Sequence, residues 1–304
     1  MFGLVKNIAQ KLNPNTVKEK QVAAVQAAAK AREKIGAGQF GTVYALGDGL
    51  VQKELPIEYK NKVLMEANLQ DVGARLGISP SIHAVATGPM SAFGTTLPME
   101  TGLNPRVQGQ IEMQDLRPTH ASYHDYVQSN PAKAQAVDLK THQQLAQLAL
   151  QNTNLSDRHP GNIMVNQVTG RPSQLDYGLA TRINNDVEKI ANLTLHVANG
   201  FGSAGLDEEG QIFMATVTDL LVNKQDLVNA MDVAKQGLAM LQKIKQPVIL
   251  KPDYVVPDPP AGMMNPNVVI GDSDAQAVRD ADQLIINKLK KEFNSQSSAQ
   301  WTDV

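Results

Sequence analysis

The chain has 304 residues, of which 42% are hydrophobic and 19% are charged, and its net charge is −2. This length suffices for one large domain or two lobes, and the composition is that of an ordinary globular protein. There is no cysteine, which excludes disulfide bonds, thiolate catalysis and cysteine-bound zinc. Because no basic block is present, nucleic acid is not an expected partner.

Residues 1–34 are expected to form an N-terminal helical arm. The stretch "MFGLVKNIAQKL" places apolar side chains on one helical face, and an Ala- and Lys-rich stretch follows it. Such an arm docks on its own domain or a partner, or alternatively lies on a membrane surface. No apolar run reaches the ~18–20 residues that a membrane span requires, so no transmembrane segment is expected.

Residues 35–114 change to the period-two pattern that is typical of strands. "IGAGQFGTVYALGDGLVQKEL" reads as a strand, a loop with Gly36, Gly38 and Gly41, and two further strands. A helix is expected over 57–76, and "SIHAVATG" and "RVQGQIEMQ" read as two more strands. Glycines let a backbone approach a phosphate closely. Because Gly41 leads into a strand and not into a helix, a dinucleotide-binding fold is not expected.

Lys53 lies in the strand that follows the glycine loop, from where it could reach the α- and β-phosphates of a nucleotide. A lysine in this role needs a carboxylate that holds it extended, and Glu66 in the following helix is the best candidate. Glu54 and Glu58 are rivals, but they lie too close to the lysine for a separate helix to present them. The alternative for Lys53 and Glu66 alike is an ordinary solvated position.

From about residue 119 the pattern is mostly helical, so residues 115–250 are expected to form a larger helical lobe. The clearest helix is "PAKAQAVDLKTHQQLAQLALQN". "NIMVN" and "PSQLDYG" read as two short strands around a turn at 166–172, and residues 186–245 return to helix. A proline-rich linker and a final helix are expected over 251–304.

The loop "LSDRHPGN" carries an unusual density of polar groups just before an apolar strand. Asp157 and Asn162 can point into one cleft, one to position an attacking hydroxyl and the other to hold a magnesium ion. Magnesium prefers hard oxygen ligands and keeps several waters, so two side chains and the phosphates of ATP suffice. The second ligand is expected to be Asp176 in "QLDYGLA". The alternative is that both segments are only turns.

In chain order, these motifs resemble the protein-kinase-like superfamily over about residues 35–180. The resemblance implies an α+β fold with two lobes, a small antiparallel β-sheet lobe with one main helix and a larger, mostly helical lobe. It implies ATP and Mg²⁺ as cofactors. "IEMQDLRPTHASYHDYV" resembles the linker that binds adenine through backbone atoms, which assigns Glu112 and Met113 to the nucleotide site together with Val43 and the loop glycines.

The catalytic loop departs from that of ordinary protein kinases, which reads His-Arg-Asp-Leu-Lys-Pro-x-Asn. Leu155 replaces the first histidine, and His159 stands where the lysine would be. "DRHPGN" is closer to phosphoinositide-kinase-like enzymes, and "HPGN" also resembles aminoglycoside and choline phosphotransferases. The resemblance implies that His159 stabilises charge on the transferring phosphoryl group or shares the base role with Asp157. A loop histidine that only packs is the alternative.

Three functions remain open. The first is transfer of the ATP γ-phosphoryl group to a protein serine or threonine, in a soluble cytoplasmic kinase. The second is a kinase for a lipid or a small molecule, because no Ala-Pro-Glu follows Asp176 to anchor a peptide-binding segment. The third is a kinase-like scaffold without catalysis, against which the complete set of polar residues argues.

Overall fold

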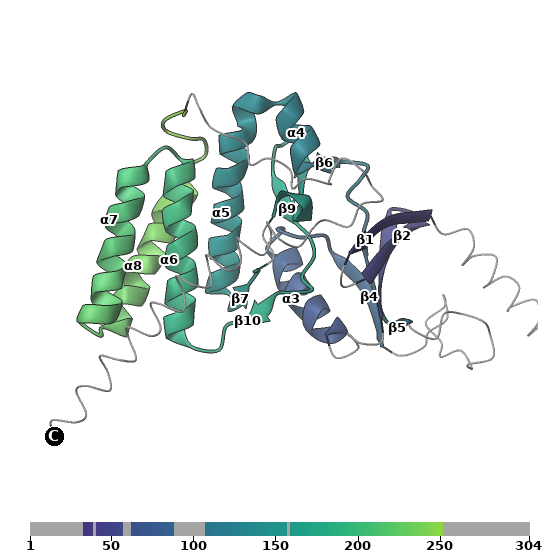
Figure 1. Cartoon of the computed structure of the whole chain (residues 1–304), viewed down its shortest axis with the longest axis horizontal. Helices are drawn as coiled ribbons and strands as arrows, with labels where there is room; N and C mark the ends of the chain where they lie inside the picture. The colour runs from purple at the N-terminus through teal and green to yellow at the C-terminus, as the bar shows by residue number, and fades with distance from the viewer. Residues whose placement is uncertain (1–32, 39–40, 57–61, 88–106, 157–158, 252–304) are drawn as a thin grey trace, which may run out of the picture. The chain divides into compact units, whose positions relative to one another are not determined.

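The computed structural model describes residues 33–38, 41–56, 62–87, 107–156 and 159–251. These residues divide into two compact units. The first unit comprises the described residues up to Met65 together with Ile82–Asp115. The second comprises Glu66–Ser81 and the described residues from Leu116 onward (Figure 1). Helix α3 (Val63–Arg75) begins in the first unit and continues in the second.

The first unit contains a five-stranded sheet in the order β1-β2-β3-β5-β4, in which all neighbours are antiparallel. Alternate residues of a strand face opposite sides of a sheet. Val51, Leu55 and Ile111 on one side are 7%, 1% and 0% exposed, so this is the apolar buried side. Gln52 and Gln110 on the opposite side are also buried, at 2% and 8% exposed. The strands are β1 (Glu33–Gly38), β2 (Gly41–Gly47), β3 (Leu50–Pro56), β4 (Ile82–Thr87) and β5 (Val107–Gln114).

The second unit is mainly helical. Helices α5, α6, α7 and α8 lie side by side (Figure 1), and their largest apolar cluster joins α5, α6 and α8 through residues such as Leu139, Leu193 and Leu241. Burial of these apolar stripes is the main favourable term in packing helices together. The helices are α4 (Tyr123–Ser129), α5 (Ala134–Leu150), α6 (Asp186–Ser203), α7 (Asp207–Thr218) and α8 (Leu227–Lys243), with short turns η3 (Pro131–Lys133), η4 (Pro160–Asn162) and η5 (Asp219–Asn223).

Two small antiparallel sheets accompany these helices. One has the order β6-β8-β9, and in the other β7 pairs with β10. They bring together segments that are far apart in the sequence. For example, β6 pairs with β8, which follows it by about 40 positions. Their strands are β6 (His120–Ser122), β7 (Thr153–Asn154), β8 (Ile163–Asn166), β9 (Pro172–Gln174) and β10 (Thr181–Arg182).

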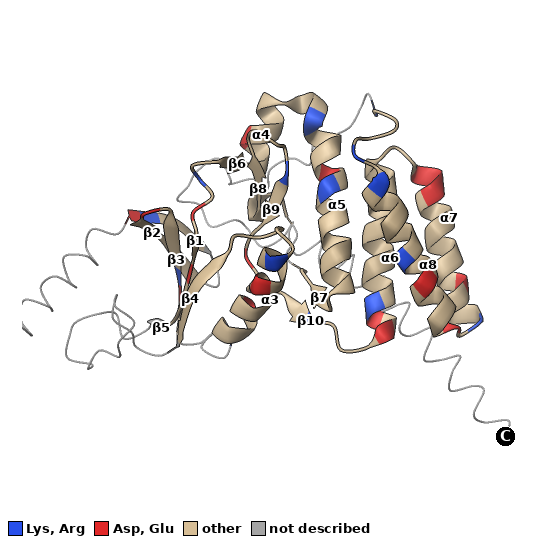
Figure 2. Cartoon of the chain, turned by 180° about the vertical axis from the view of Figure 1, so that it is seen from behind, with Lys and Arg blue, Asp and Glu red and all other residues tan. Residues whose placement is uncertain are grey.

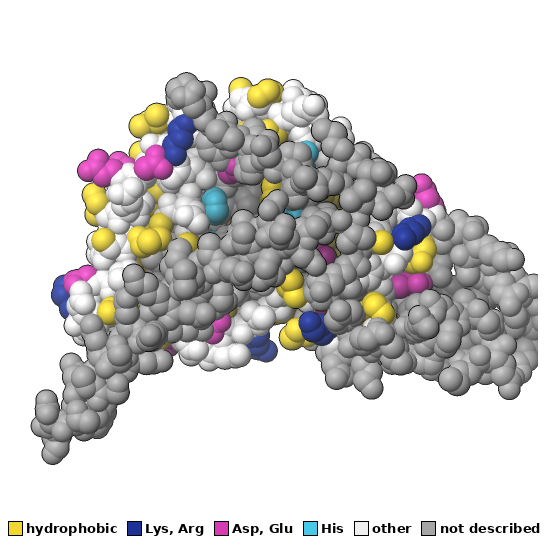
Figure 3. Space-filling view, in the orientation of Figure 1, with side chains coloured by type: hydrophobic (Ala, Val, Ile, Leu, Met, Phe, Trp, Pro, Cys, Tyr) yellow, Lys and Arg dark blue, Asp and Glu magenta, His cyan; other side chains and the backbone are white. Residues whose placement is uncertain are grey.

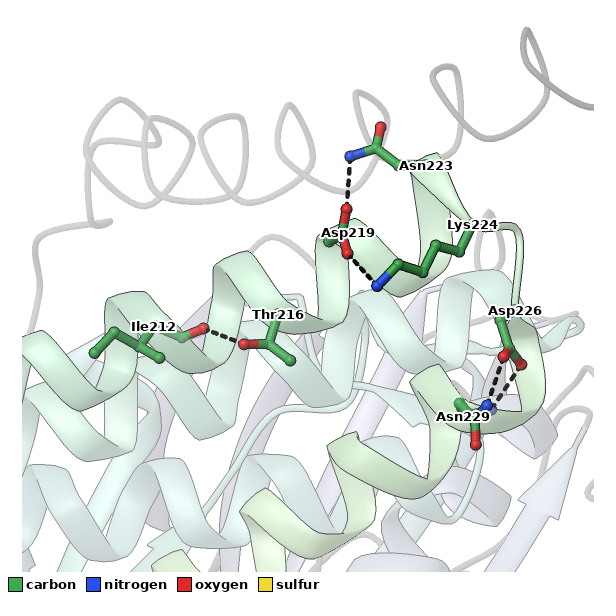
Figure 4. A network of polar contacts seen from close by, with 7 residues as sticks. All are labelled: Ile212, Thr216, Asp219, Asn223, Lys224, Asp226 and Asn229. Carbon is green, nitrogen blue, oxygen red and sulfur yellow. Dashed lines mark hydrogen bonds and ion pairs between the residues drawn. The ribbon is translucent and has the colours of Figure 1, made fainter.

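An exposed polar network forms the corner between α7 and α8 (Figure 4). Asp219 accepts hydrogen bonds from Lys224 at 2.8 Å and from Asn223 at 2.9 Å, and these bonds lower the pKa of its carboxyl group. Asp226 then begins α8 by accepting from the backbone N–H of Asn229 at 3.0 Å, as an N-cap residue does. The network ends one helix and starts the next, which is a structural role.

Most of the elements expected in the described residues are confirmed, and the α+β class is confirmed with them. The end of the expected N-terminal helix is different, since Glu33 and Lys34 pair with Ala45 and Tyr44 as part of β1. The helix expected over 57–76 is observed as α3, and residues 57–61 lie outside the described part. So do the rest of the N-terminal arm and everything after Lys251.

Charged side chains of both signs are interspersed over the helices of the second unit (Figure 2). On the face shown in Figure 3, the described acidic and basic residues lie among hydrophobic ones.

Within the residues that the structure describes, none of the helices combines the length and the apolar character needed to span a lipid bilayer.

Candidate functional site

The glycine loop is a β-hairpin, as the strand–loop–strand pattern predicts. Gly38 pairs with Gly41 across the hairpin of β1 and β2, and Gly36 lies at an irregularity of the β1–β2 register. A Cβ atom on Gly41 would lie 2.4 Å from the carbonyl oxygen of Glu54, whereas one on Gly36 would meet only Val43 at 3.9 Å. Gly41 is therefore required by the close approach of β3, and Gly36 is not constrained in this way.

Lys53 lies in β3 with its side chain on the buried side of the sheet. It pairs with Val43 on β2 and Ile111 on β5, and it is only 7% exposed. Its Cε atom lies 3.6 Å from the position of a Cβ on Gly41. The glycine hairpin and the end of the Lys53 side chain are thus neighbours.

The rival carboxylate Glu54 belongs to the opposite side of β3. Gln52, two residues earlier on the same side of the strand, donates a hydrogen bond of 2.9 Å to Gln110, and Gln110 donates one of 3.5 Å to Glu54. Glu54 therefore takes part in a separate polar chain and does not lie on the side of Lys53. Glu58, the other rival, lies outside the described residues.

Glu112 and Met113, which the sequence assigns to the nucleotide site, face opposite sides of β5. Met113 pairs with Val51 and is 9% exposed, so it lies on the same side of the sheet as Lys53. Glu112 pairs with Gln52 and is half-buried on the other side. The prediction for both residues concerns backbone atoms, so this arrangement leaves it untested.

Glu66 lies on α3 and is 1% exposed. Carboxylates are seldom buried to this degree unless they are paired. Glu66 belongs to the second unit and Lys53 to the first, and the predicted pairing of these two side chains stays a prediction.

The polar loop is fixed at both of its ends. Before it, β7 pairs with β10, Leu155 is 2% exposed, and the Ser156 hydroxyl donates to the carbonyl of Leu179 at 2.7 Å. After it, η4 leads directly into β8. Asp157 lies outside the described residues. The segment before it is held by residues that follow Asp176, and the segment after it is held by β9 and Leu175, which precede Asp176.

His159 begins η4 as its N-cap residue. The backbone N–H of Gly161 donates to Nδ1 of His159 at 3.1 Å, and the N–H of Asn162 donates to the carbonyl of His159 at 2.9 Å. An imidazole that accepts at Nδ1 carries its proton on Nε2 when it is neutral. His159 is 8% exposed, so the local chain fixes the orientation of its ring.

Asn162 and Asp176 are brought close together by the pairing of β8 with β9. Ile163 pairs with Gln174, and the N–H of Leu175 donates to the carbonyl of Asn162 at 2.8 Å. Asp176 follows with a left-handed φ of 49°, and its Oδ1 accepts from the N–H of Gly178 at 3.1 Å. Aspartate tolerates this conformation better than most residues.

These two side chains have the donor atoms that suit magnesium. An amide oxygen and a carboxylate oxygen are hard ligands, and Mg²⁺ commonly uses one or two protein ligands with phosphates and water. The part of the chain that the structure describes contains no group of three His, Cys, Asp or Glu side chains able to hold a metal ion. Asn162 and Asp176 thus offer one amide oxygen and one carboxylate oxygen to a cation.

A second imidazole lies near His159. Burial lowers the pKa of His124, the neighbouring Asp125 raises it, and His159 lowers it further. His124 lies in α4, one residue after the buried ring of Tyr123, with which it makes an edge contact. Burial and the nearby His159 thus both disfavour the charged form of His124.

The segment Asp176–Gly178 has a partner that the sequence does not reveal. The hydroxyl groups of Tyr177 and Ser79 share a hydrogen bond of 2.5 Å. Ser79 follows α3 and precedes Tyr177 by 98 positions, so no local pattern in the sequence signals this contact.

No protein-family model matches the sequence, and no curated protein shows significant sequence similarity to it.

The glycine hairpin yields a prediction with an internal control. Gly41→Ala places a Cβ against backbone atoms of β3, which cannot swing aside, so we expect a loss of about 1–3 kcal/mol in unfolding free energy. Gly36→Ala should change it by less than about 0.5 kcal/mol. Urea unfolding followed by circular dichroism measures both variants. Equal stability of the two variants would contradict the close approach of β2 and β3.

Proposed function

We propose that the protein is an ATP- and magnesium-dependent phosphotransferase that moves the γ-phosphoryl group of ATP to a hydroxyl group. The observation that supports this most strongly is the hydrogen bond from Leu175 to Asn162, which brings the Asn162 and Asp176 segments side by side. A second support is the position of Lys53 beside Gly41 on the buried side of the small sheet.

Each polar residue has a role in this proposal. Asn162 and Asp176 hold Mg²⁺, which neutralises charge on the phosphates of ATP. Lys53 binds the α- and β-phosphates, and Glu66 is the carboxylate proposed to hold it. The proton of the acceptor hydroxyl passes to the base of the polar loop, Asp157, while the Nε2–H of His159 donates to the transferring phosphoryl group.

The preferred acceptor is a serine or threonine hydroxyl of a protein. The strand-loop-strand glycine hairpin supports this choice, because its pattern is most similar to that of protein kinases. The sequence "DRHPGN" instead resembles lipid and small-molecule kinases, so these remain the alternative acceptors. Because the donor is ATP, the proposal also assigns the activity to the cytoplasm.

Transfer of labelled phosphate tests the function directly. With γ-labelled ATP, Mg²⁺ and a mixed lysate, we expect label in protein, and in lipid or small molecules if the alternative acceptors hold. Lys53→Met should abolish the transfer, because the phosphates lose their cation. Lys243→Met, a change at an exposed position at the end of α8, is the matched control and should retain the wild-type rate.

Two outcomes would overturn the proposal. Absence of label in every fraction, from a folded wild-type protein, leaves only the non-catalytic scaffold. Full transfer by Lys53→Met means that the lysine does not bind phosphate.

The polar loop yields a second prediction, which separates its two candidate groups. A positioned acid–base group contributes typically ~10²–10⁴-fold in rate. Asp157→Asn removes the charge but keeps the size of the side chain, so kcat should fall by about that range with little change in ATP affinity. His159→Ala should lower kcat less if Asp157 is the base and more if His159 is. His83→Ala, at an exposed position of β4, is the control. Wild-type turnover in both loop variants would mean that "DRHPGN" is only a turn.

A further inference from the structure

The hydroxyl group of Tyr177 lies where a side chain on Gly73 would be. A Cβ atom on Gly73 of α3 would lie 2.3 Å from the Tyr177 hydroxyl oxygen and 2.4 Å from Oγ of Ser79. The two hydroxyl groups meet in this space and hydrogen-bond to each other. Burial raises the pKa of Tyr177 to about 12, although the bond from Ser79 lowers it.

This contact joins the two segments that carry carboxylates of the proposed site. Tyr177 directly follows Asp176, and Gly73 lies about two helical turns after Glu66 on α3. The chain is also held two residues before Asp176, because the N–H of Gln174 donates to the carbonyl of Ile78 at 2.8 Å. Asp176 is thus flanked on both sides by bonds to the segment that follows α3.

The ring itself belongs to a buried cluster with members from α3 and from the polar loop. Tyr177 is 0% exposed and packs in one cluster with Leu69 of α3 and Leu155, two residues before Asp157. Apolar packing alone would be satisfied by phenylalanine. The hydroxyl group adds a directional bond, which fixes the rotation and depth of the ring more narrowly than packing does.

We propose that Ser79 and Tyr177 are positioning residues for Asp176. Their hydrogen bond, in the space left by Gly73, holds the left-handed turn at Asp176 and so sets the direction of its carboxylate toward the metal. This inference rests on the proposed function for its consequence in catalysis, but the coupling of Ser79 to the Asp176 turn is a property of the second unit alone.

The test compares Tyr177→Phe, Ser79→Ala and the double variant with Tyr123→Phe. All of these changes remove one hydroxyl group per site and leave the carbon framework in place. Tyr123 is the matched control because it is 1% exposed and its hydroxyl donates to Asp138 at 2.7 Å, within the same unit. The first readout is the Mg²⁺ concentration that gives half the maximal rate of phosphoryl transfer. The second readout is exchange of the Gly178 amide hydrogen, observed by NMR.

We expect Tyr177→Phe and Ser79→Ala each to raise the half-saturating Mg²⁺ concentration by about tenfold, the typical effect of losing one buried hydrogen bond. The double variant should equal the single ones, because the two groups act as a pair. Tyr123→Phe should leave the Mg²⁺ requirement unchanged. A wild-type Mg²⁺ requirement in both single variants, or an equal rise in Tyr123→Phe, would overturn the inference.

Exchange of the Gly178 amide separates this inference from the proposed function. That amide donates to Oδ1 of Asp176, so its exchange should accelerate in Tyr177→Phe and Ser79→Ala and not in Tyr123→Phe. If the wild-type protein transfers no phosphate but this pattern is seen, the proposed function fails and the positioning of Asp176 stands. Unchanged exchange in both variants refutes the positioning, whatever the activity.

Discussion

Three segments of the second unit share one buried cluster, and the candidate site in this unit depends on it. Leu69 belongs to the helix that carries Glu66, Leu155 to the loop that carries Asp157, and Tyr177 to the segment that carries Asp176. Close packing transmits displacement, because an interior has few voids that can absorb it. A change in any of these apolar side chains would therefore move polar groups that are distant from it in the sequence.

Hydrogen bonds fix the relative positions of the segments that apolar packing brings together. The bond between Leu175 and Asn162 aligns the two proposed magnesium ligands, and that between Ser156 and Leu179 closes the other side of the loop. In the first unit the constraint is steric, because the carbonyl of Glu54 lies where a side chain of Gly41 would be. In each unit, then, the candidate polar side chains lie on backbone that strand pairing holds in place.

The sequence predicts the parts of the fold that arise from local patterns. Strands β2 and β3, helix α5 and the turn between β8 and β9 all depend on residues close to one another in the chain, and all are confirmed. From about residue 119 the local pattern is mostly helical and predicts no strand at His120–Ser122, yet these residues form β6 by pairing with β8. Such long-range pairing overrides local preference.

The same distinction applies to the candidate site. Residues such as Asn162 and Asp176 are recognisable by type and spacing, and the strand pairing places them side by side. The contact of Ser79 with Tyr177 was not predictable, because it joins two ordinary hydroxyl residues in a space defined by a glycine of α3. Only the folded chain reveals that the three residues meet.

Binding of ATP, measured by calorimetry with and without magnesium, tests the central claim most directly. The account predicts that ATP binds in the presence of Mg²⁺ and binds much more weakly in EDTA. Asp176→Asn should weaken Mg-ATP binding by about tenfold or more. Loss of a group that only supports a metal ligand already weakens metal binding by about tenfold, and loss of the ligand itself should cost at least as much. Asp232→Asn, at an exposed position of α8, should bind as the wild type does. Equal affinity with Mg²⁺ and with EDTA, or an unchanged affinity in Asp176→Asn, would contradict the assignment of Asn162 and Asp176 as magnesium ligands.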